Sequence, residues 1–163
     1  MLMIRAIFAC DSAGGIGKNG TIPWPKNAED LKWFRENTTG QIVIMGRKSW
    51  DDPMMPKPLP NRYNIVVSDR LVFHGPNMIL KRGDVDKYLK IFTDIEKDVW
   101  IIGGARLFSS TLHLCDEIWL SRIEGDYQCD THVTIPDTFR LYSTEELKER
   151  NLVIEKYKNE TIS

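Results

Sequence analysis

Short apolar runs alternate with helix-like segments over most of the chain. Runs of strand length occur at residues 2–9, 41–45, 63–67, 78–80, 98–102 and 117–123. Composition and spacing predict helices at 28–37, 46–52, 84–92 and 105–112, and Asn27 is suited to cap the first of them. Strands that alternate with helices form parallel sheets covered by those helices. We therefore expect an α/β fold with a mostly parallel central sheet and flanking helices.

The C-terminal part of the chain breaks this alternation. Residues 139–144 and 152–157 have strand-like composition and enclose the polar segment 145–151. A strand pair joined without a long helix is antiparallel, so we expect an antiparallel C-terminal strand at the sheet edge. Ser143 and Glu146 have the spacing of a capping box, which leaves a short helical turn open there. With no repeat or linker, residues 1–163 are expected to form a single domain.

Composition argues against several classes of partner. A formal net charge of -1 gives no electrostatic reason to bind nucleic acid or an anionic membrane, and no apolar run is long enough to span a bilayer. The N-terminus lacks the basic segment and cleavage site of a signal peptide. The three cysteines form no CxxC pair, and the three histidines show no metal-ligand spacing. We expect a cytoplasmic monomer with free thiols and no bound metal.

Residues 15–20 fit the GxGxxG pattern and follow a predicted strand, as in dinucleotide-binding Rossmann folds. That pattern requires the third glycine to open a helix. Here Pro23 and Pro25 follow closely, and two prolines so spaced do not begin a helix. Asn19-Gly20 instead predicts a tight turn. We interpret residues 11–25 as a flexible loop and reject a Rossmann-type dehydrogenase.

Asp30 lies in the first turn of the first predicted helix, directly before Leu31 and four residues before Phe34. An acid at this position stabilises the helix dipole, a role that Glu29 fits equally well. If Asp30 faces an apolar cleft, desolvation raises its pKa and the carboxyl can handle protons near neutral pH. Helix spacing alone leaves both interpretations open.

Three further segments carry groups that suit a ligand. Residues 103–106 (Gly-Gly-Ala-Arg) follow a strand, so they either admit a phosphate to the next helix or form a plain strand-to-helix turn. Residues 47–49 (Arg-Lys-Ser) follow another strand and either bind phosphate or form an exposed basic turn. Arg62 follows the rigid segment 58–61 and either pairs bidentately with a carboxylate or is solvated.

Several short stretches are weak signals individually, but the order in which they occur along the chain is specific to one family. These stretches are Ile16-Gly17, Ile22-Pro23-Trp24, Asp30-Leu31 with Trp33-Phe34, residues 43–47 (Val-Ile-Met-Gly-Arg), Ser49-Trp50, Pro58-Leu59-Pro60 with Arg62, Asn64-Ile65, Ile102-Gly103-Gly104 and Asp130-Thr131-His132. In this order the chain resembles the dihydrofolate reductase family over residues 4 to about 136. The resemblance implies NADPH-dependent reduction of 7,8-dihydrofolate to 5,6,7,8-tetrahydrofolate, by hydride transfer to C6 and protonation of N5, in one-carbon and thymidylate metabolism.

The resemblance also implies roles for individual residues. Asp30 would hydrogen-bond the pterin ring and favour its protonated form, with Ile22 and Trp24 beside it in the catalytic centre. The implied substrate-binding residues are Ala6, Ile7, Asp30, Leu31, Phe34, Leu59, Arg62, Ile102 and Ser121. The implied cofactor-binding residues are Ala6, Ile7, Ile16, Gly46, Arg47, Lys48, Ser49, Ser68, Asp69, Arg70, Ile102, Gly103, Gly104, Ala105, Arg106, Leu107 and Phe108. Gly103-Gly104 matches the family's cis peptide, and residues 11–24 match its mobile lid, steadied by Asp130.

Several positions depart from the family pattern. Ser49 and Ser121 stand where threonine is usual, which keeps the hydroxyl, and Ala105 replaces a third glycine. Asp69 lies near the expected 2′-phosphate of the cofactor, so the preference for NADPH over NADH stays open. Two alternatives remain: a related pterin or pyrimidine reductase, against which Arg62 argues, and a non-catalytic folate- or nucleotide-binding structural protein, against which Asp30 argues.

Overall fold

The computed structural model describes residues 3–70, 74–92, 97–147 and 151–161. Its elements follow the chain as β1 (Ile4–Cys10), β2 (Gly15–Gly17), α1 (Ala28–Thr38), β3 (Ile42–Gly46), α2 (Arg47–Asp51), β4 (Tyr63–Val67), β5 (Met78–Leu80), η1 (Arg82–Asp84), α3 (Val85–Phe92), β6 (Val99–Gly103), α4 (Ala105–Thr111), η2 (Leu112–Leu114), β7 (Glu117–Ile123), β8 (Thr131–His132), β9 (Phe139–Leu147) and β10 (Leu152–Asn159). Eight of these strands form one sheet, in the order β5-β4-β3-β6-β1-β7-β10-β9.

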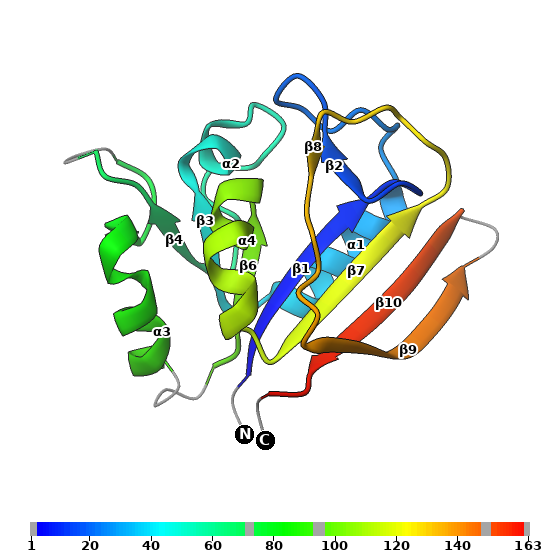
Figure 1. Cartoon of the computed structure of the whole chain (residues 1–163). Coiled ribbons are helices and arrows are strands. Elements are labelled where there is room, and N and C mark those ends of the chain that lie inside the picture. Colours follow the sequence, from blue (N-terminus) through cyan, green and yellow to red (C-terminus); the bar gives the residue numbers. More distant parts are fainter. Residues whose placement is uncertain (1–2, 71–73, 93–96, 148–150, 162–163) are drawn as a thin grey trace.

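The sheet is mostly parallel. Every neighbouring pair from β5 to β7 runs parallel, whereas β10 is antiparallel to both β7 and β9 (Figure 1). From β1 the chain passes outward through β3, β4 and β5, then inserts β6 between β3 and β1 and adds β7 on the far side of β1. Such a reversal of strand order opens a crevice beyond the carboxyl ends of the strands. The predicted α/β architecture is confirmed, and it places a ligand site at the end of the sheet where α2, β2 and β8 lie in Figure 1.

Alternate strand residues pack against different helices. Ile42, Ile44 and Ile101 belong to a buried cluster with α3 and α4, which lie in front of the sheet in Figure 1. Val43 and Met45 belong to a second cluster with α1 and α2. Because β3 is buried on both faces, its sequence is a continuous apolar run rather than an alternation.

The helical turn suggested by Ser143 and Glu146 is wrong. Both residues lie in β9, opposite Lys156 and Val153 of β10. The ladder to β10 satisfies their backbone groups, which outweighs a local capping pattern. The other predicted strands and helices are confirmed with small differences at their ends, and the pairing of β2 with β8 was not predicted.

Other sequence predictions concern membranes, metals and thiols. Within the described ranges, no helix is both long and apolar enough to cross a bilayer. The same residues contain no group of three or more His, Cys, Asp or Glu side chains placed to bind a metal ion. Cys10, Cys115 and Cys129 are free thiols, as predicted, and burial raises the pKa of Cys10 to about 11.

Candidate active site

The first turn of α1 brings an acid against the sheet. Asn27 caps the helix by accepting hydrogen bonds from the backbone N–H groups of Glu29 and Asp30, each at 3.1 Å. The Asp30 carboxyl reaches the hydroxyl of Ser121, a buried residue of β7. Burial raises the pKa of Asp30, and the hydrogen bond from Ser121 offsets part of that rise. Asp30 is therefore suited to keep a proton at a higher pH than an ordinary aspartate.

One face of α1 continues from this acid. Asp30, Phe34 and Thr38 follow at four-residue intervals, so they share a face about 12 Å long. Arg62 meets its far end, where Nη1 donates to Thr38 Oγ1 at 3.0 Å and the guanidinium lies 5.8 Å from the Phe34 ring centroid. Burial and the nearby charge of Arg35 lower the pKa of Arg62. An acid, an aromatic ring and a cation thus follow one another along the helix.

The loop that carries Arg62 is fixed by Asn64. This side chain is fully buried; its Oδ1 accepts from Leu59 N at 2.9 Å, and its Nδ2 donates to Leu59 O and Arg62 O, both at 3.0 Å. Arg62 Nε in turn donates to Pro60 O at 3.0 Å. Leu59 is buried in the same cluster as Phe34, so the loop forms an apolar wall beside α1. Asn64-Ile65 is one of the stretches that carry the resemblance, but the sequence assigned Asn64 no role, because one asparagine near the start of a strand does not show what it binds.

Replacing Asn64 with alanine should destabilise the protein by about 2–4 kcal/mol, because buried backbone groups of Leu59 lose their partners. The midpoint of urea unfolding measures the change. Asn64→Asp keeps the acceptor for Leu59 N but places a carboxylate oxygen 3.0 Å from the carbonyl oxygens of Leu59 and Arg62, so at neutral pH it should destabilise at least as much as Asn64→Ala. A loss below about 0.5 kcal/mol for Asn64→Ala, the range of ordinary surface changes, would contradict this account.

The carboxyl ends of β3 and β6 approach one another closely. Gly103-Gly104 is a cis peptide, as the resemblance implied. A Cβ atom on Gly46 would lie 3.7 Å from Gly103 O, and one on Gly103 would lie 3.6 Å from Ser49 Oγ. The absence of side chains at these glycines lets the backbone of β3 and β6 and the Ser49 hydroxyl approach one another closely. This glycine cradle, made of Gly46, Gly103 and Gly104, lies where the chain reversal predicts a crevice.

Cations lie near the glycine cradle on neighbouring elements. Arg47 pairs with Asp51 at 3.0 Å within α2. A pocket of about 170 Å³ is lined by Val67, Arg82, Val85, Arg106, Leu107 and Ser110. Asp69 lies beyond the end of β4, where its Oδ1 accepts from Arg82 N at 3.1 Å and its carboxylate lies 3.9 Å from Arg82 Nε. Backbone groups, a hydroxyl and arginines form a donor set that fits a phosphate-containing dinucleotide, apart from the negative charge of Asp69.

The loop after β1 is tied to the segment after β7. Lys18 and Thr21 close a two-residue turn with backbone hydrogen bonds of 2.8 and 3.0 Å, so the turn predicted at Asn19-Gly20 is confirmed. Asn19 N donates to Asp130 Oδ2 at 2.9 Å. Beyond the turn, Ile22 is 58% exposed, whereas Trp24 is buried and lies 6.1 Å from Tyr127.

The structure distributes the predicted residues along α1. Asp30, the glycine cradle and the loop after β1 lie toward the carboxyl ends of the strands, whereas Arg62 lies beside Thr38 at the amino ends of β3 and β4. Ile7, Ile102, Phe34 and Leu59 share one cluster on the α1 face. Ala6 is fully buried in the α3 and α4 cluster, and its contact with a ligand stays a prediction. Phe8, two residues closer to the strand end, was not among the predicted residues, and its ring centroid lies 4.5 Å from that of Phe108. The rule that ligands bind at carboxyl strand ends favours Phe8 over Ala6.

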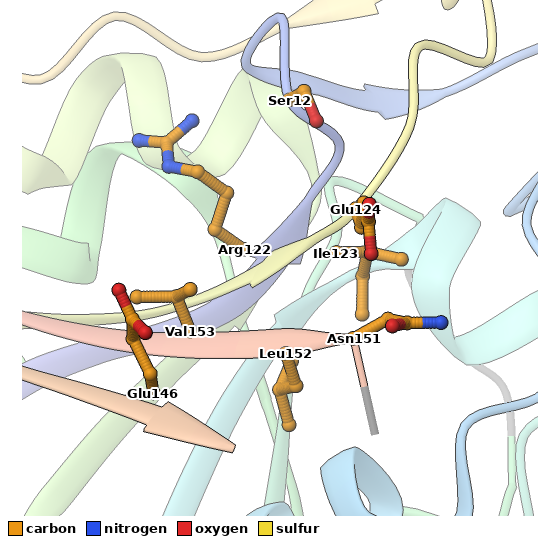
Figure 2. Close-up of a pocket in the computed structure, with 8 residues that line it drawn as sticks. All are labelled: Ser12, Arg122, Ile123, Glu124, Glu146, Asn151, Leu152 and Val153. Atoms are coloured by element: carbon orange, nitrogen blue, oxygen red, sulfur yellow. The ribbon is translucent and has the colours of Figure 1, made fainter. Parts of the chain in front are cut away.

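A second hollow lies at the carboxyl end of β7 and the start of β10, beside the loop after β1. Its volume is about 300 Å³, and it is lined by Ser12, Arg122, Ile123, Glu124, Glu146, Asn151, Leu152 and Val153 (Figure 2). Figure 2 shows Arg122 and Val153 on one side of the β7 and β10 pair, with Ile123 and Leu152 on the other. Arg122 is bound to Glu155 at 2.9 Å. None of the predicted site residues lines this hollow, so it is not the candidate active site.

Comparison with known proteins identifies the family. A family model for dihydrofolate reductase matches residues 3–161. A dihydrofolate reductase of Bacillus subtilis is 34% identical over 133 residues, covering 80% of this chain and 74% of the relative. A bifunctional dihydrofolate reductase-thymidylate synthase of Paramecium tetraurelia is 35% identical over 149 residues; the match covers 89% of this chain but 31% of that longer protein.

A solved structure agrees with these matches. Dihydrofolate reductase from Enterococcus faecalis, complexed with NADP(H) and RAB-propyl, superposes with a TM-score of 0.81 and 27% sequence identity. The match covers 96% of this chain and 95% of that one, which extends the likeness to the antiparallel C-terminal strands. With the family model matching nearly the whole chain, the chain belongs to the dihydrofolate reductase family.

Proposed function

We propose that this chain reduces 7,8-dihydrofolate to 5,6,7,8-tetrahydrofolate with NADPH as the reductant. The observation that carries the proposal is the face of α1 along which Asp30, Phe34 and Arg62 follow one another. Dihydrofolate has a protonatable ring, an aromatic middle and a terminal carboxylate in the same order. Membership of the dihydrofolate reductase family supports the same reaction.

The residues along α1 divide the work of binding and protonation. Asp30 would accept a hydrogen bond from the pterin ring and favour its protonated form, while Ser121 orients the Asp30 carboxyl. Leu31, Phe34 and Leu59 would enclose the pterin and aminobenzoyl rings and exclude water. Arg62 would bind the α-carboxylate of the glutamate tail through two parallel hydrogen bonds. Ile22 and Trp24 would cover the reacting centre from the loop after β1.

Residues at the ends of β3, β4 and β6 would hold the cofactor, which supplies the hydride when bound. The glycine cradle admits its backbone closely, and Ser49, Arg106 and Arg47 would bind its phosphates. Phe8 and Phe108 would lie near its reactive ring, together with Ile16. Its adenosine end would enter the pocket that Arg82 and Arg106 line.

A related pterin or pyrimidine reductase would have no use for a cation at the end of the α1 face, whereas Arg62 is held there by Pro60 and Thr38. A non-catalytic binding protein would have no use for a carboxyl whose pKa is raised by burial beside a ring site. We further propose that residues 1–163 act as one domain, as a cytoplasmic monomer that binds no nucleic acid and serves one-carbon and thymidylate metabolism.

The test of the proposed function is direct. Oxidation of NADPH is followed by absorbance in the presence of dihydrofolate, and wild-type protein should turn over steadily. Folate-free pterins should be reduced far more slowly, because they lack the carboxylate that Arg62 binds. Absence of turnover with dihydrofolate would refute the proposed enzymatic activity. Equal rates of reduction for folate-free pterins and dihydrofolate would favour a pterin reductase.

Replacing Asp69 with serine should strengthen NADPH binding about two- to fivefold at low salt and leave NADH binding unchanged. The side chain of Asp69 is 66% exposed, so its repulsion of a 2′-phosphate is of the size of a surface charge interaction and is screened by salt. Fluorescence titration with both cofactors at two ionic strengths measures the effect. The distant, exposed Asp137 provides a matched control as Asp137→Ser. Equal changes for NADPH and NADH would contradict the placement of Asp69.

A further inference from the structure

The loop after β1 is attached to residues 125–132 at its base, through the pairing of β2 with β8, and at its tip, and the base and the tip differ in burial. At its tip, Asn19 N donates to Asp130 Oδ2 at 2.9 Å, and Asp130 N donates to Gly17 O at 3.1 Å. Asn19 and Asp130 are both exposed. Hydrogen bonds from Asn19 and Thr131 lower the pKa of Asp130, so its carboxylate stays charged. Water can replace these contacts, and the tip can therefore separate readily.

The attachment at the base of the loop is built around one buried carboxylate. Asp11 has no exposed surface. Its Oδ1 accepts from Ala13 N at 3.0 Å and Gly15 N at 2.8 Å, and its Oδ2 accepts from Tyr127 N at 3.0 Å and Cys129 Sγ at 3.5 Å. Burial alone would raise the pKa of Asp11, but the hydrogen bonds from Tyr127, Gly15 and Ala13 more than offset it and lower the pKa.

Neighbouring contacts reinforce this base. Ser12 N donates to Gly125 O and Gly125 N donates to Ser12 Oγ, both at 2.9 Å. Arg122 Nη1 donates to the backbone oxygen of Asp11 at 3.4 Å. Gly15 packs so tightly that a Cβ atom there would lie 2.3 Å from Cys129 Cβ. One oxygen of Asp11 thus binds the loop itself and the other binds the segment after β7.

We propose that Asp11 is a positioning residue for hydride transfer, because it fixes the base of the loop while the tip opens and closes. The inference rests on the proposed function, in which Ile22 and Trp24 cover the reacting centre. Breaking the base would leave a buried carboxylate and several buried N–H groups without partners, whereas breaking the tip would not. The moving part is thereby confined to residues between Gly15 and Trp24, since Trp24 is buried in a cluster with Leu152, and the exposed Ile22 returns to one position at each closure. A displacement of about 1 Å at a reacting centre is enough to lower a rate severely.

Asp11→Asn is the first test. An amide offers one acceptor oxygen, so its NH₂ group must face either Gly15 N or Tyr127 N and release one side of the base. We expect the single-turnover rate of hydride transfer to fall about tenfold, with a larger isotope effect from deuterated NADPH, while the Kd for dihydrofolate changes little. Asp116→Asn is the matched control, because Asp116 Oδ2 accepts from Ile4 N at 2.8 Å at the opposite end of the same strand. An equal slowing in Asp116→Asn would reduce Asp11 to general stabilisation of β1 and overturn the proposal.

Amide hydrogen exchange provides a readout that needs no substrate. In wild type the Gly15 and Tyr127 amides should exchange much more slowly than the Asn19 amide. Asp11→Asn should speed exchange at Gly15 or Tyr127 at least tenfold, whereas Asp130→Asn should speed exchange at Asn19 alone. Fast exchange at Gly15 and Tyr127 in wild type would overturn the inference. Wild type that shows this exchange pattern but does not reduce dihydrofolate would refute the proposed function separately.

A second pair of variants avoids changing the buried charge. Gly15→Ala places a methyl group against Cys129 and should open the base, with the same slowing of hydride transfer and the same exchange at Tyr127. Cys129→Gly removes the colliding atoms, so the double variant should recover most of the rate. Failure of Cys129→Gly to restore either readout would show that contact between the two segments does not position the loop, even if Asp11→Asn does not fold.

Discussion

Replacing Asp30 with asparagine should lower the rate of hydride transfer at pH 7 by about 10²-fold or more, the scale of a general acid-base contribution. An amide is close in size to the carboxyl and can still accept a hydrogen bond from Ser121, but it does not ionise. The variant therefore binds the pterin ring without favouring its protonated form. Single-turnover measurements with saturating NADPH and dihydrofolate isolate this step from product release.

The pH dependence separates loss of proton handling from loss of structure. Because burial raises the pKa of Asp30, the wild-type rate should be level at low pH and fall as the pH rises through that pKa. In Asp30→Asn the rate should instead keep rising about tenfold for each unit of falling pH, since only substrate protonated in solution reacts. Identical pH profiles would contradict the role of Asp30.

The stability of Asp30→Asn provides an independent test of the raised pKa. A carboxyl whose folded pKa is raised binds its proton more tightly in the folded state, so folding is penalised once the pH exceeds the unfolded pKa. Asp30→Asn removes that penalty and should raise the unfolding temperature at neutral pH but not at pH 3. Glu29→Gln, at the neighbouring position of the same first turn, should change neither the rate nor its pH profile. A slow but destabilised Asp30→Asn would indicate damage to α1 instead.

The elements of the fold that could be predicted are those specified by the pattern of neighbouring residues in the sequence. Apolar runs on both faces of β3 and the cap at Asn27 are read directly from neighbouring residues, and the structure has both. Ser143 and Glu146 show the limit, since pairing with a strand distant from any capping signal decided their conformation. A local rule fails where a long-range ladder satisfies the same backbone groups.

The site divides in the same way. Helix spacing did not distinguish Asp30 from Glu29; the resemblance did, and the contact with Ser121 on β7 supplies the physical reason. Asn64 and Asp11 were beyond sequence reasoning, because each acts through backbone groups of the folded chain that no spacing rule identifies. Residues that bind a ligand can be predicted from their residue type and their position at the end of a strand. Residues that hold them in place can be identified only from the contacts in the folded structure.

Replacing Arg62 with alanine should weaken dihydrofolate binding roughly 10²-fold and leave NADPH binding unchanged. Two charge-assisted hydrogen bonds to a carboxylate account for a loss of this size, as each contributes about 1.5–3 kcal/mol before the cost of ordering the tail. Arg62 meets little electrostatic competition for that carboxylate. Among the described residues it contacts the Thr38 hydroxyl, the Pro60 carbonyl and the Phe34 ring, and Arg35 adds positive charge nearby.

The chemistry of the arginine head can be tested in steps, by titrating each variant with dihydrofolate and with NADPH. Arg62→Lys keeps the charge but loses the planar pair of donors, so it should recover only part of the affinity. Arg140→Ala is the matched control, since Arg140 is 71% exposed and pairs with Glu160 on the C-terminal strands. A folate-free pterin should bind wild type and Arg62→Ala equally, because it lacks the tail. Equal losses of affinity for dihydrofolate and NADPH would place Arg62 outside the substrate site. They would also contradict the interpretation that the α1 face binds dihydrofolate from its pterin ring at Asp30 to its glutamate tail at Arg62.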